Sequence, residues 1–308
     1  MAQYTKLSSE ELTDIVSHYP VGNTLLLENI SGGFGNSNFK LTTTKGTFLL
    51  KICDEKNITE LQMQMKLLIH LQQHSYPTVY PVLLKSGEML YVTQDYNVMI
   101  YPFLDGKTPN PSQNVLEQIG SALAQLHRIS PLTGLPRFPM GMIQITPFLD
   151  EVKETQFHSH PFLTWLKSEL EWIKPELEKT LPKGLLHGDL FLDNTLFDGE
   201  KMVTILDFEE ACHDILLIDV AMTIIGCCYT NQHQLDIPAV HGFLYSYNSL
   251  RPLTEDEWDS LDGFIHYAAL SIAFWRFRQF NIRYPNVVNA ELYQEMITRS
   301  TNWQSITL

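Results

Sequence analysis

Residues 186–219 contain four polar side chains of the types that a phosphoryl-transfer site needs. They are His187, Asp189, Asn194 and Asp207. An aspartate can accept the proton of a substrate hydroxyl, which is the role we expect for Asp189. Asn194 and Asp207 offer the oxygen ligands that hold a magnesium ion against transferring phosphates. The spacing therefore predicts chemistry in which a phosphoryl group moves to a hydroxyl.

The local pattern predicts how these side chains are brought together. Residues 194–197 are apolar enough for a short strand, Asp198 and Gly199 favour a turn, and residues 202–206 favour the antiparallel partner strand. Asp207 follows that second strand. A lone His-x-Asp or Asp-Asn is explained equally well by an ordinary turn. The hairpin, with a carboxylate at its exit, favours the catalytic interpretation.

A glycine-rich segment near the N-terminus, ISGGFGNSNF at 30–39, predicts a second part of the site. Glycines let a backbone approach phosphates without side-chain obstruction. Lys51 lies on the following strand, where its ammonium can pair with nucleotide phosphates. The segment is not a Walker loop, because no G-K-[ST] follows, and an ordinary flexible turn is the alternative. The candidate phosphate-binding residues are Gly33, Gly35, Asn36, Ser37 and Lys51.

Residues 186–219 resemble the catalytic and metal loops of the aminoglycoside phosphotransferase and choline kinase superfamily. That superfamily has H-G-D where protein kinases have H-R-D. HGDLFLDNTLF followed by DFEEACHD is most similar to its homoserine kinase family, and landmarks along nearly the whole chain appear in the same order. The resemblance implies ATP and Mg²⁺. It also implies an α+β, bilobal protein-kinase-like fold, with a nucleotide-binding lobe of antiparallel sheet (1–101) and a mostly helical catalytic and acceptor-binding lobe (102–308).

The same resemblance implies a carboxylate that holds Lys51 from the next helix. Apolar residues at helical spacing predict that helix over residues 59–73. Glu60 is its only acidic residue and is our candidate, although Gln62 or Gln64 is an alternative at the position where relatives have glutamate. A glutamate in the first turn also stabilises a helix through the helix dipole, which is the structural alternative for Glu60.

The adenine site is expected where two strands lead into a hinge, at residues 96–104 (YNVMIYPFL). Pro102 prevents the ladder from continuing. The resemblance places adenine contacts on the backbone near Tyr101, Phe103 and Leu104. An apolar sheet edge closed by proline fits the same residues.

Three further residues are predicted to be structural. His187 is expected to fix the catalytic loop rather than to move protons. Asp219 opens an apolar helix, where the resemblance implies that it braces the catalytic loop. His127 ends an apolar helix over 115–128 and is expected to cap that helix or face the core.

Prolines and apolar spacing predict the remaining elements of the second half. Residues 131–147 contain several prolines and glycines and favour a loop. The helix that begins at Pro161 is expected to end or kink at Pro175. A last long helix is predicted over 255–280.

The acceptor is the least specified part of the interpretation. Homoserine or a related amino acid is favoured by the resemblance, and Arg276 could bind its carboxylate with two parallel hydrogen bonds. Leu192 replaces the proline that is usual in the catalytic loop of that family, and Glu209 and Glu210 replace aromatic residues. Glu209 or its neighbour could attract an amine, as in choline, ethanolamine, hydroxylysine or an aminoglycoside. Solvent-facing glutamates and a surface arginine are the structural alternatives.

The sequence disfavours two other functional classes, a pseudokinase and a protein kinase. A nucleotide-binding pseudokinase is disfavoured by the intact set of Lys51, Asp189, Asn194 and Asp207. A protein kinase is disfavoured because DFEEACHD passes almost directly to Asp219, which leaves no activation segment with an A-P-E landmark.

Composition agrees with a globular enzyme of two lobes. The chain has 308 residues, of which 44% are hydrophobic and 18% charged. A net charge of −14 and a pI near 5.2 argue against nucleic acid or an anionic membrane as the general partner.

No leader or membrane-spanning run is evident, so the cytoplasm is expected. The four cysteines show no CxxC spacing, which favours reduced thiols over zinc. The number of subunits is left open.

Overall fold

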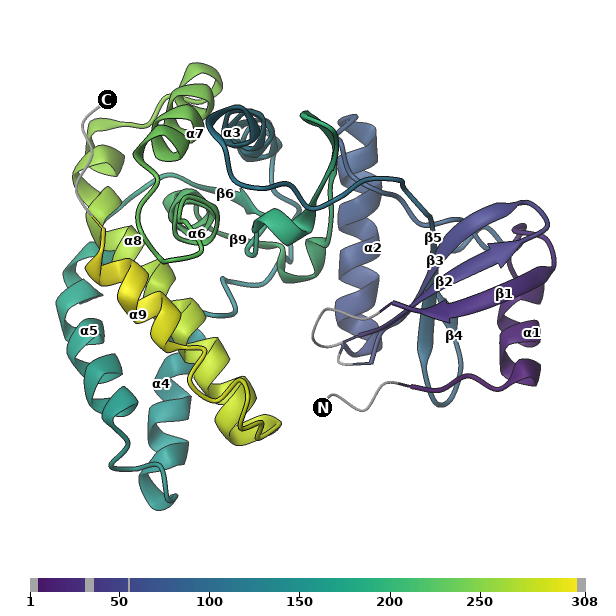
Figure 1. Cartoon of the computed structure of the whole chain (residues 1–308), viewed down its shortest axis with the longest axis horizontal. Helices are drawn as coiled ribbons and strands as arrows, with labels where there is room; N and C mark the ends of the chain where they lie inside the picture. Colours follow the sequence, from purple (N-terminus) through teal and green to yellow (C-terminus); the bar gives the residue numbers. More distant parts are fainter. Residues whose placement is uncertain (1–4, 31–35, 55, 304–308) are drawn as a thin grey trace. The chain divides into compact units, whose positions relative to one another are not determined.

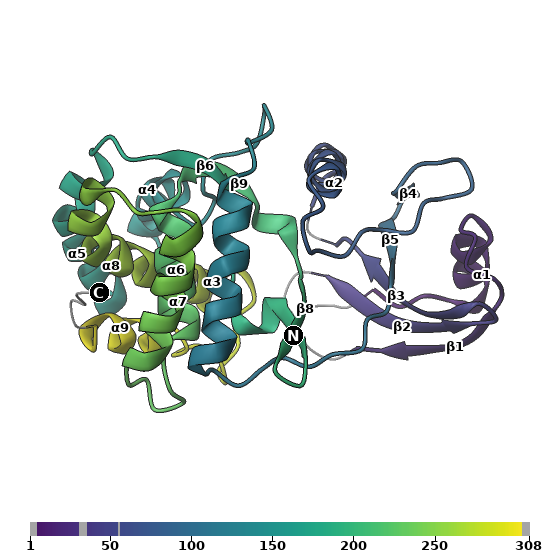
Figure 2. The same ribbon diagram turned by 90° about the horizontal axis from the view of Figure 1, so that it is seen from above.

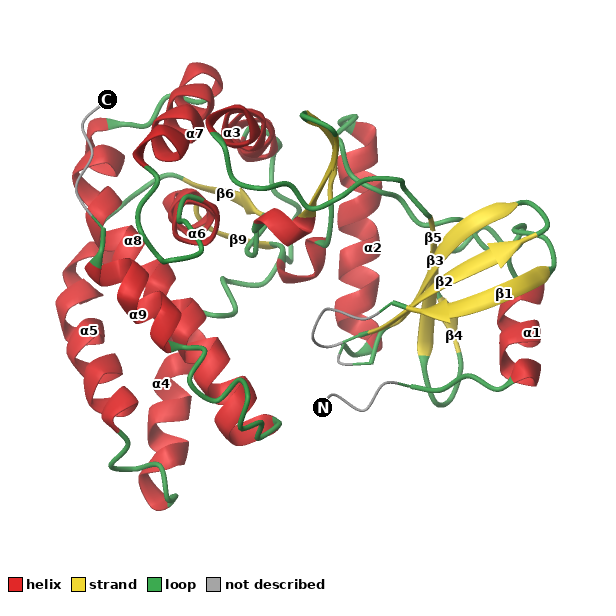
Figure 3. Ribbon diagram, viewed as in Figure 1, coloured by secondary structure: helices red, strands yellow, loops and turns green. Residues whose placement is uncertain are grey.

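The computed structural model describes residues 5–30, 36–54 and 56–303 of the chain (Figure 1). It divides into two compact units, Met1–Gly106 and Lys107–Leu308. The first is built on an antiparallel sheet and the second mostly on helices, as the sequence predicts (Figure 3).

The first unit is a five-stranded antiparallel sheet in the order β1-β2-β3-β5-β4. Its strands are β1 (Thr24–Asn29), β2 (Ser37–Thr43), β3 (Gly46–Ile52), β4 (Tyr91–Val92) and β5 (Asn97–Pro102). Its helices are α1 (Ser9–Ser17) and α2 (Ile58–Gln73). The predicted helix over 59–73 is confirmed, because α2 begins at Ile58 behind an Asn57 cap.

Alternation along the strands places a core on each face of this sheet. Leu50 and Ile100 belong to a cluster that includes Ile15 of α1. The next residues along the strands point the other way, so Met99 packs in a second cluster with Leu61 of α2. Because both faces are covered, the central parts of β3 and β5 are short apolar runs, Phe48–Leu50 and Val98–Tyr101.

The second unit begins with three helices and ends with four, with short strands between them (Figure 2). The first helices are α3 (Gln113–His127), α4 (Met142–Glu151) and α5 (Pro161–Leu177), with the 3-10 turn η1 (Val152–Glu154) after α4. The later elements are α6 (Leu217–Cys227), α7 (Ile237–Leu250), α8 (Glu255–Phe277), the π-turn η4 (Arg278–Arg283) and α9 (Gln294–Thr301).

The strands of this unit form two pairs that carry the candidate site. β6 (Lys183–Leu186) pairs with β9 (Cys212–Ile215), and β7 (Thr195–Asp198) pairs with β8 (Lys201–Ile205), all antiparallel. The 3-10 turns η2 (Leu192–Asn194) and η3 (Phe208–Glu210) precede β7 and β9 respectively. The predicted hairpin is therefore confirmed, but its two turn residues are Gly199 and Glu200, one position later than predicted, because Asp198 pairs with Lys201.

Helix α6 is the centre of the helical unit. Nearly all of its side chains are buried, and α8 packs against it as well as against α5 and α9. A helix that is apolar on every side must be enclosed by other elements. Asp219 in its first turn is therefore held in the interior, completely buried.

The sequence prediction was wrong at Pro147, which was assigned to a loop but lies inside α4. Pro175 was expected to end or kink α5, and the helix ends two residues later, at Leu177. An internal proline removes one backbone donor and leaves a carbonyl free one turn earlier. Both prolines lie on exposed faces, so water can satisfy those carbonyls. The last long helix also ends earlier than predicted, at Phe277.

Within the described parts of the chain, no helix combines the length and hydropathy needed to cross a membrane.

Candidate functional site

The catalytic loop runs from the end of β6 to the start of β7, residues 187–194. Leu186 pairs with Cys212 in the β6–β9 ladder, so the loop begins beside the segment that follows Asp207. Gly188 has a positive φ of 83°, and a Cβ at this position would lie 2.3 Å from the carbonyl oxygen of Glu210. The H-G-D glycine is thus required by both the backbone conformation and the close approach.

His187 is completely buried and joins the loop to the hairpin. Its Nε2 lies 2.8 Å from the Leu206 carbonyl, its Nδ1 accepts the Asp189 N–H at 3.3 Å, and its ring packs on Phe208. Burial lowers the pKa of His187, so the neutral ring carries its proton on Nε2, where the carbonyl needs a donor. Both ring nitrogens are used by the backbone, which supports the predicted positioning role.

Asp219 braces the start of the same loop. Its Oδ2 accepts the His187 N–H at 2.6 Å and its Oδ1 accepts the Gly188 N–H at 2.8 Å. Its Oδ2 also lies 3.2 Å from Nε2 of His127. Hydrogen bonds to a charged acceptor are about twice as strong as neutral ones. The two consecutive loop amides are therefore held by one carboxylate, in agreement with the predicted brace.

Asn194 lies beside Asp189. The Asn194 Nδ2 donates to the Asp189 carbonyl at 2.7 Å and to the Asp189 Oδ2 at 3.2 Å. These bonds turn the amide nitrogen inward, so the opposite end of the amide, Oδ1, is the available ligand for a cation. Burial, followed by the negative charges of Asp207, Asp193 and Glu210, raises the pKa of Asp189 well above its usual range.

Asp207 is brought to this loop through the backbone. Leu206, immediately before it, donates its N–H to the Asn194 carbonyl at 2.8 Å. Asp207 itself has φ 58° and ψ 71°, a left-handed conformation that costs a non-glycine residue roughly 1–3 kcal/mol. Such strain concentrates at functional sites. The conformation turns the chain sharply out of β8 and into η3.

The donor set suits a divalent cation that also binds phosphates. Asn194 supplies a neutral oxygen and Asp207 an exposed carboxylate, and Mg²⁺ commonly takes only one or two carboxylates plus substrate phosphates. Among the residues that the structure describes, no three His, Cys, Asp or Glu side chains form a metal cage. A site completed by phosphates does not need such a cage.

In the first unit, the predicted Gly33 and Gly35 lie outside the described residues. Asn36 and Ser37 are both buried. The Ser37 hydroxyl donates to Asp54 at 2.7 Å and accepts the Thr5 N–H at 2.8 Å. Ser37 therefore fastens the start of β2 to neighbouring segments, and its role toward a nucleotide stays a prediction.

Lys51 lies on the α2 face of the sheet and is 8% exposed. It pairs across the ladder with Asn38 of β2. The predicted helix partner, Glu60, lies in the exposed first turn of α2, where its carboxylate accepts the Asn57 N–H at 2.8 Å as part of a capping box. One turn later Gln64 is buried, 7% exposed, with an Oε1 that accepts no hydrogen bond.

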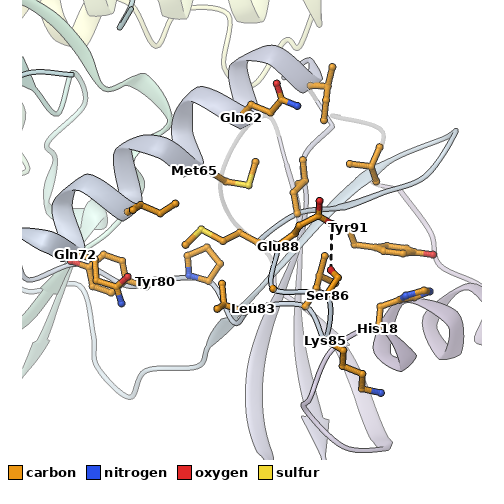
Figure 4. A pocket seen from close by; sticks show the side chains of 18 of the residues that line it. His18, Gln62, Met65, Gln72, Tyr80, Leu83, Lys85, Ser86, Glu88 and Tyr91 are labelled. Carbon is orange, nitrogen blue, oxygen red and sulfur yellow. Dashed lines mark hydrogen bonds between the residues drawn. The ribbon is translucent and has the colours of Figure 1, made fainter. Parts of the chain in front are cut away.

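The geometry therefore gives Glu60 a capping function and leaves Gln64 as the polar side chain on the buried stripe of α2. The buried residues of α2 are Leu61, Gln64, Leu67, Leu68 and Leu71, and Leu61 packs with Met99 of the sheet. Other residues of α2, including Gln62 and Met65, line a separate hollow of about 920 Å³ against the segment 80–92 (Figure 4). Apart from Gln62, which is an alternative partner of Lys51, none of the predicted site residues lines that hollow.

The hinge residues follow the alternation of β5. The Phe103 N–H bonds the Thr47 carbonyl at 3.2 Å, so residues 101 and 103 direct their backbone groups toward β3. The Ile100 carbonyl points to the opposite edge, where it accepts the Val82 N–H at 2.7 Å. By the same alternation the Pro102 carbonyl and the Leu104 N–H point outward. This alternation assigns the outward backbone groups to Pro102 and to Leu104, which is one of the predicted residues, whereas the backbone groups of Tyr101 and Phe103 point toward β3.

Comparison with known proteins agrees with this geometry. Residues 27–264 match the model of the phosphotransferase enzyme family. That match spans most of the chain. The chain belongs to the phosphotransferase enzyme family.

Two relatives show how far the similarity extends. The homoserine kinase of Methylobacillus flagellatus is 30% identical over 294 residues, which cover 92% of this chain and 89% of the relative. The homoserine kinase of Nitrobacter hamburgensis is 32% identical over 295 residues, covering 91% and 87%. This phosphotransferase is therefore an ATP-dependent kinase that acts on a hydroxyl of a small molecule, as its sequence predicts.

Solved structures show the same fold at low identity. A microcompartment-associated aminopropanol kinase superposes with a TM-score of 0.75 at 16% identity, covering 95% of each chain. A spectinomycin phosphotransferase in complex with ADP and spectinomycin gives 0.71 at 14% identity, covering 96% of this chain and 95% of that one. The predicted kinase-like fold of the phosphotransferase is confirmed.

The two candidate acceptor residues of the phosphotransferase lie in different surroundings. Glu209 lies on η3, two residues after Asp207, and is half-buried. Arg276, near the end of α8, forms an ion pair with Glu295 and donates to the Leu292 carbonyl at 3.0 Å. A substrate carboxylate would have to share this guanidinium with Glu295. Both acceptor assignments stay predictions.

The sequence interpretation overlooked one contributor to the site. Tyr247 on α7 contacts His127, which in turn contacts Asp219. No motif surrounds Tyr247, and its only signal is an apolar stripe along α7. A residue that acts through buried contacts from a distant helix leaves no spacing pattern to read.

We expect Gly188→Ala to disable the phosphotransferase. The new Cβ must displace the Glu210 carbonyl and also occupy a left-handed conformation, so kcat should fall at least 100-fold and stability by about 2 kcal/mol. Gly199→Ala is the matched control. Its φ is also positive, at 58°, but nothing lies within 4 Å of the new Cβ. It should cost only about 1 kcal/mol, with kcat retained. Equal kinetic effects in the two variants would contradict the proposed role of the close contact.

We expect Gln64→Leu to weaken ATP binding. A buried amide oxygen on the Lys51 face of the sheet is a suitable acceptor for the lysine ammonium, so its loss should raise KM for ATP about 5- to 10-fold and leave KM for the acceptor unchanged. Gln62→Leu, on the same helix but exposed, is the control. Steady-state kinetics with each substrate varied would decide. If only Glu60→Gln raised the KM for ATP, Glu60 and not Gln64 would be the partner of Lys51.

Proposed function

We propose that this protein is a homoserine kinase that transfers the γ-phosphoryl group of ATP to the side-chain hydroxyl of homoserine with Mg²⁺. The similarity to two homoserine kinases across about nine-tenths of the chain carries the proposal. The braced loop that presents Asp189 beside Asn194 supports the reaction itself.

In the proposed reaction Asp189 accepts the proton of the acceptor hydroxyl. Its carboxylate is held in place by Asn194, and its backbone N–H by His187. In phosphoryl transfer the proton leaves late, so the residue must chiefly orient the hydroxyl toward the phosphorus. A fixed carboxylate meets that requirement better than a strongly basic one.

Asn194 and Asp207 are the proposed ligands of Mg²⁺. When bound, the ion neutralises charge that develops on the phosphates. The negative potential that Asp207, Asp193 and Glu210 create at Asp189 favours a cation there. Asn194 serves both groups, because its nitrogen binds Asp189 while its oxygen remains available as a ligand.

Lys51 is the proposed phosphate contact from the first unit. Its ammonium lies on a buried sheet face, where a charge interacts more strongly than it does in bulk water. The glycines at 32, 33 and 35 are proposed to approach the phosphates through their backbone. The outward backbone groups of Pro102 and Leu104 are proposed to bind adenine.

For the acceptor, homoserine presents an ammonium and a carboxylate in addition to its hydroxyl. Glu209 is proposed to attract the ammonium, since it lies two residues after Asp207 on the half-buried turn η3. Arg276 is proposed to bind the carboxylate, in competition with Glu295.

An amino alcohol is the second candidate acceptor. The three acidic neighbours of Asp189 favour a cationic acceptor, and Arg276 is already paired. These observations suit an amine without a carboxylate, and a structural neighbour is an aminopropanol kinase.

We expect Asp189→Asn to lower kcat by about 10²–10⁴, because the amide cannot take the hydroxyl proton. KM for ATP should change little. The measurement is acceptor-dependent ADP release. Asp198→Asn, in the exposed turn of the β7–β8 hairpin, is the control and should behave as wild type. Undiminished turnover by Asp189→Asn would refute the proposed mechanism, and ATP binding without acceptor-dependent release by the wild type would favour a pseudokinase.

A matched pair of acceptors separates the two candidate functions. L-Homoserine and 3-aminopropan-1-ol carry the same amine and hydroxyl and differ only by the carboxylate. If the carboxylate is recognised through charge-assisted hydrogen bonds, kcat/KM for homoserine should be higher by about 100-fold. Equal or reversed values would replace homoserine with an amino alcohol as the acceptor. Choline and ethanolamine extend the same panel.

A further inference from the structure

A chain of buried polar groups leads away from the catalytic loop into the helical unit. Asp219 binds the loop amides and lies 3.2 Å from Nε2 of His127 on α3. Nδ1 of His127 lies 2.7 Å from the hydroxyl of Tyr247 on α7. Asp219 and Tyr247 are completely buried, and so is the His127 side chain. The contacts join residues that are 92 and 120 positions apart in the sequence.

The direction of each hydrogen bond follows from the groups involved. Burial lowers the pKa of His127, so the imidazole is neutral and has a single N–H. The Asp219 carboxylate can only accept, which places that proton on Nε2. Nδ1 is then an acceptor, and the Tyr247 hydroxyl must donate to it. Burial also raises the pKa of Tyr247, which keeps its proton in place.

We propose that Tyr247 is a positioning residue for the catalytic loop and acts through His127 on the Asp219 carboxylate. The inference rests on the proposed kinase reaction for its kinetic readout. Tyr247 touches none of the reacting groups. It holds the far end of the imidazole, so that the near end presents its N–H to Asp219 in one fixed orientation.

Tyr247 is itself held by Arg251, the residue that caps the end of α7. The guanidinium of Arg251 lies over its ring, 5.8 Å from the centroid. Arg251 Nη1 is 2.7 Å from Oε1 of the completely buried Glu257. Oε2 of Glu257 accepts the Thr254 N–H at 2.9 Å in the capping box that starts α8. The chain of contacts thus ends on the first turn of the longest helix.

The contact between α3 and α7 depends on their close approach. A Cβ on Gly120 of α3 would lie 2.4 Å from the Phe243 carbonyl of α7. The two helices therefore lie nearly backbone to backbone, one turn from Tyr247. This separation lets a tyrosine hydroxyl reach a histidine ring that is already bonded on its other side.

Removing the hydroxyl leaves the buried Nδ1 of His127 without a donor. The imidazole is then restrained at one end only, and the Asp219 carboxylate loses its fixed third donor. The hydrogen bonds from the His187 and Gly188 N–H groups to Asp219 should weaken, because a carboxylate with fewer fixed donors can rotate. The expected result is a slower chemical step with unchanged nucleotide binding.

The test is Tyr247→Phe, with Tyr245→Phe as the control on the same helix, where the side chain is 70% exposed. Tyr247→Phe should lower kcat with homoserine about 10-fold, leave KM for ATP within 2-fold, and speed hydrogen exchange in a peptide spanning residues 186–194. Tyr245→Phe should match wild type in all three. Wild-type kcat and exchange in Tyr247→Phe would overturn the proposal.

A double-mutant cycle separates positioning from general destabilisation. If Tyr247 acts through His127, adding Tyr247→Phe to His127→Leu should change kcat less than 2-fold further. A full additional 10-fold loss would overturn the route through His127. The exchange measurement needs no acceptor. A wild-type protein inactive on homoserine would therefore refute the proposed function, while loop exchange would still decide the role of Tyr247.

Discussion

A single buried carboxylate organises the catalytic half of this molecule. Asp219 lies in the first turn of a helix that is enclosed on all sides, and it is completely inaccessible to solvent. An unpaired charge in such a place would cost several kcal/mol. The cost is offset by two loop amides, by the N–H of His127 and by the positive end of the α6 dipole. The catalytic loop is thus ordered because its amides are needed to stabilise the core.

This dependence explains why the loop can carry strain and concentrated charge. Asp207 has a left-handed backbone, and Asp189 lies where burial and neighbouring carboxylates oppose its ionisation. Neither feature would persist in a loop held only by its own contacts. The brace at Asp219 and the contacts of His187 with Leu206 hold both ends of the site before any ligand arrives. A cation and phosphates would relieve the repulsion that the apo protein tolerates.

The sequence predicted those features that depend on neighbours along the chain. The β7–β8 hairpin follows from apolar runs on either side of Asp198 and Gly199, and α2 from the spacing of its leucines. The Asp219 brace was expected from family resemblance and agrees with the observed geometry. The local pattern misled at Pro147, where a turn signal was outweighed by solvent access. Glu60 was chosen by its residue type; its carboxylate caps α2, and its pairing with Lys51 stays a prediction.

Contacts between distant segments could not be read in this way. His127 and Tyr247 meet only because α3 and α7 approach closely at Gly120, and nothing in either helix's own pattern specifies its partner. Gln64 is a further residue that the sequence pattern alone could not single out. Its amide has no obvious chemical function in the sequence, yet burial on the sheet face of α2, with an oxygen that accepts no hydrogen bond, distinguishes it from Gln62.

The buried residues that position the catalytic loop are different from the residues proposed to bind the acceptor. The groups that orient the loop are buried in the helical core and interact with backbone amides, so they are indifferent to which hydroxyl is phosphorylated. Glu209 and Arg276 lie outside this buried set and are half-buried or paired. Glu209 and Glu210 also occupy positions where the resembled family has aromatic residues. If Glu209 and Arg276 bind the acceptor as proposed, a change of acceptor needs substitutions around Asp207 and on α8 and leaves the buried contacts of the loop intact. This separation accounts for one fold serving relatives named for acceptors as different as homoserine, aminopropanol and spectinomycin.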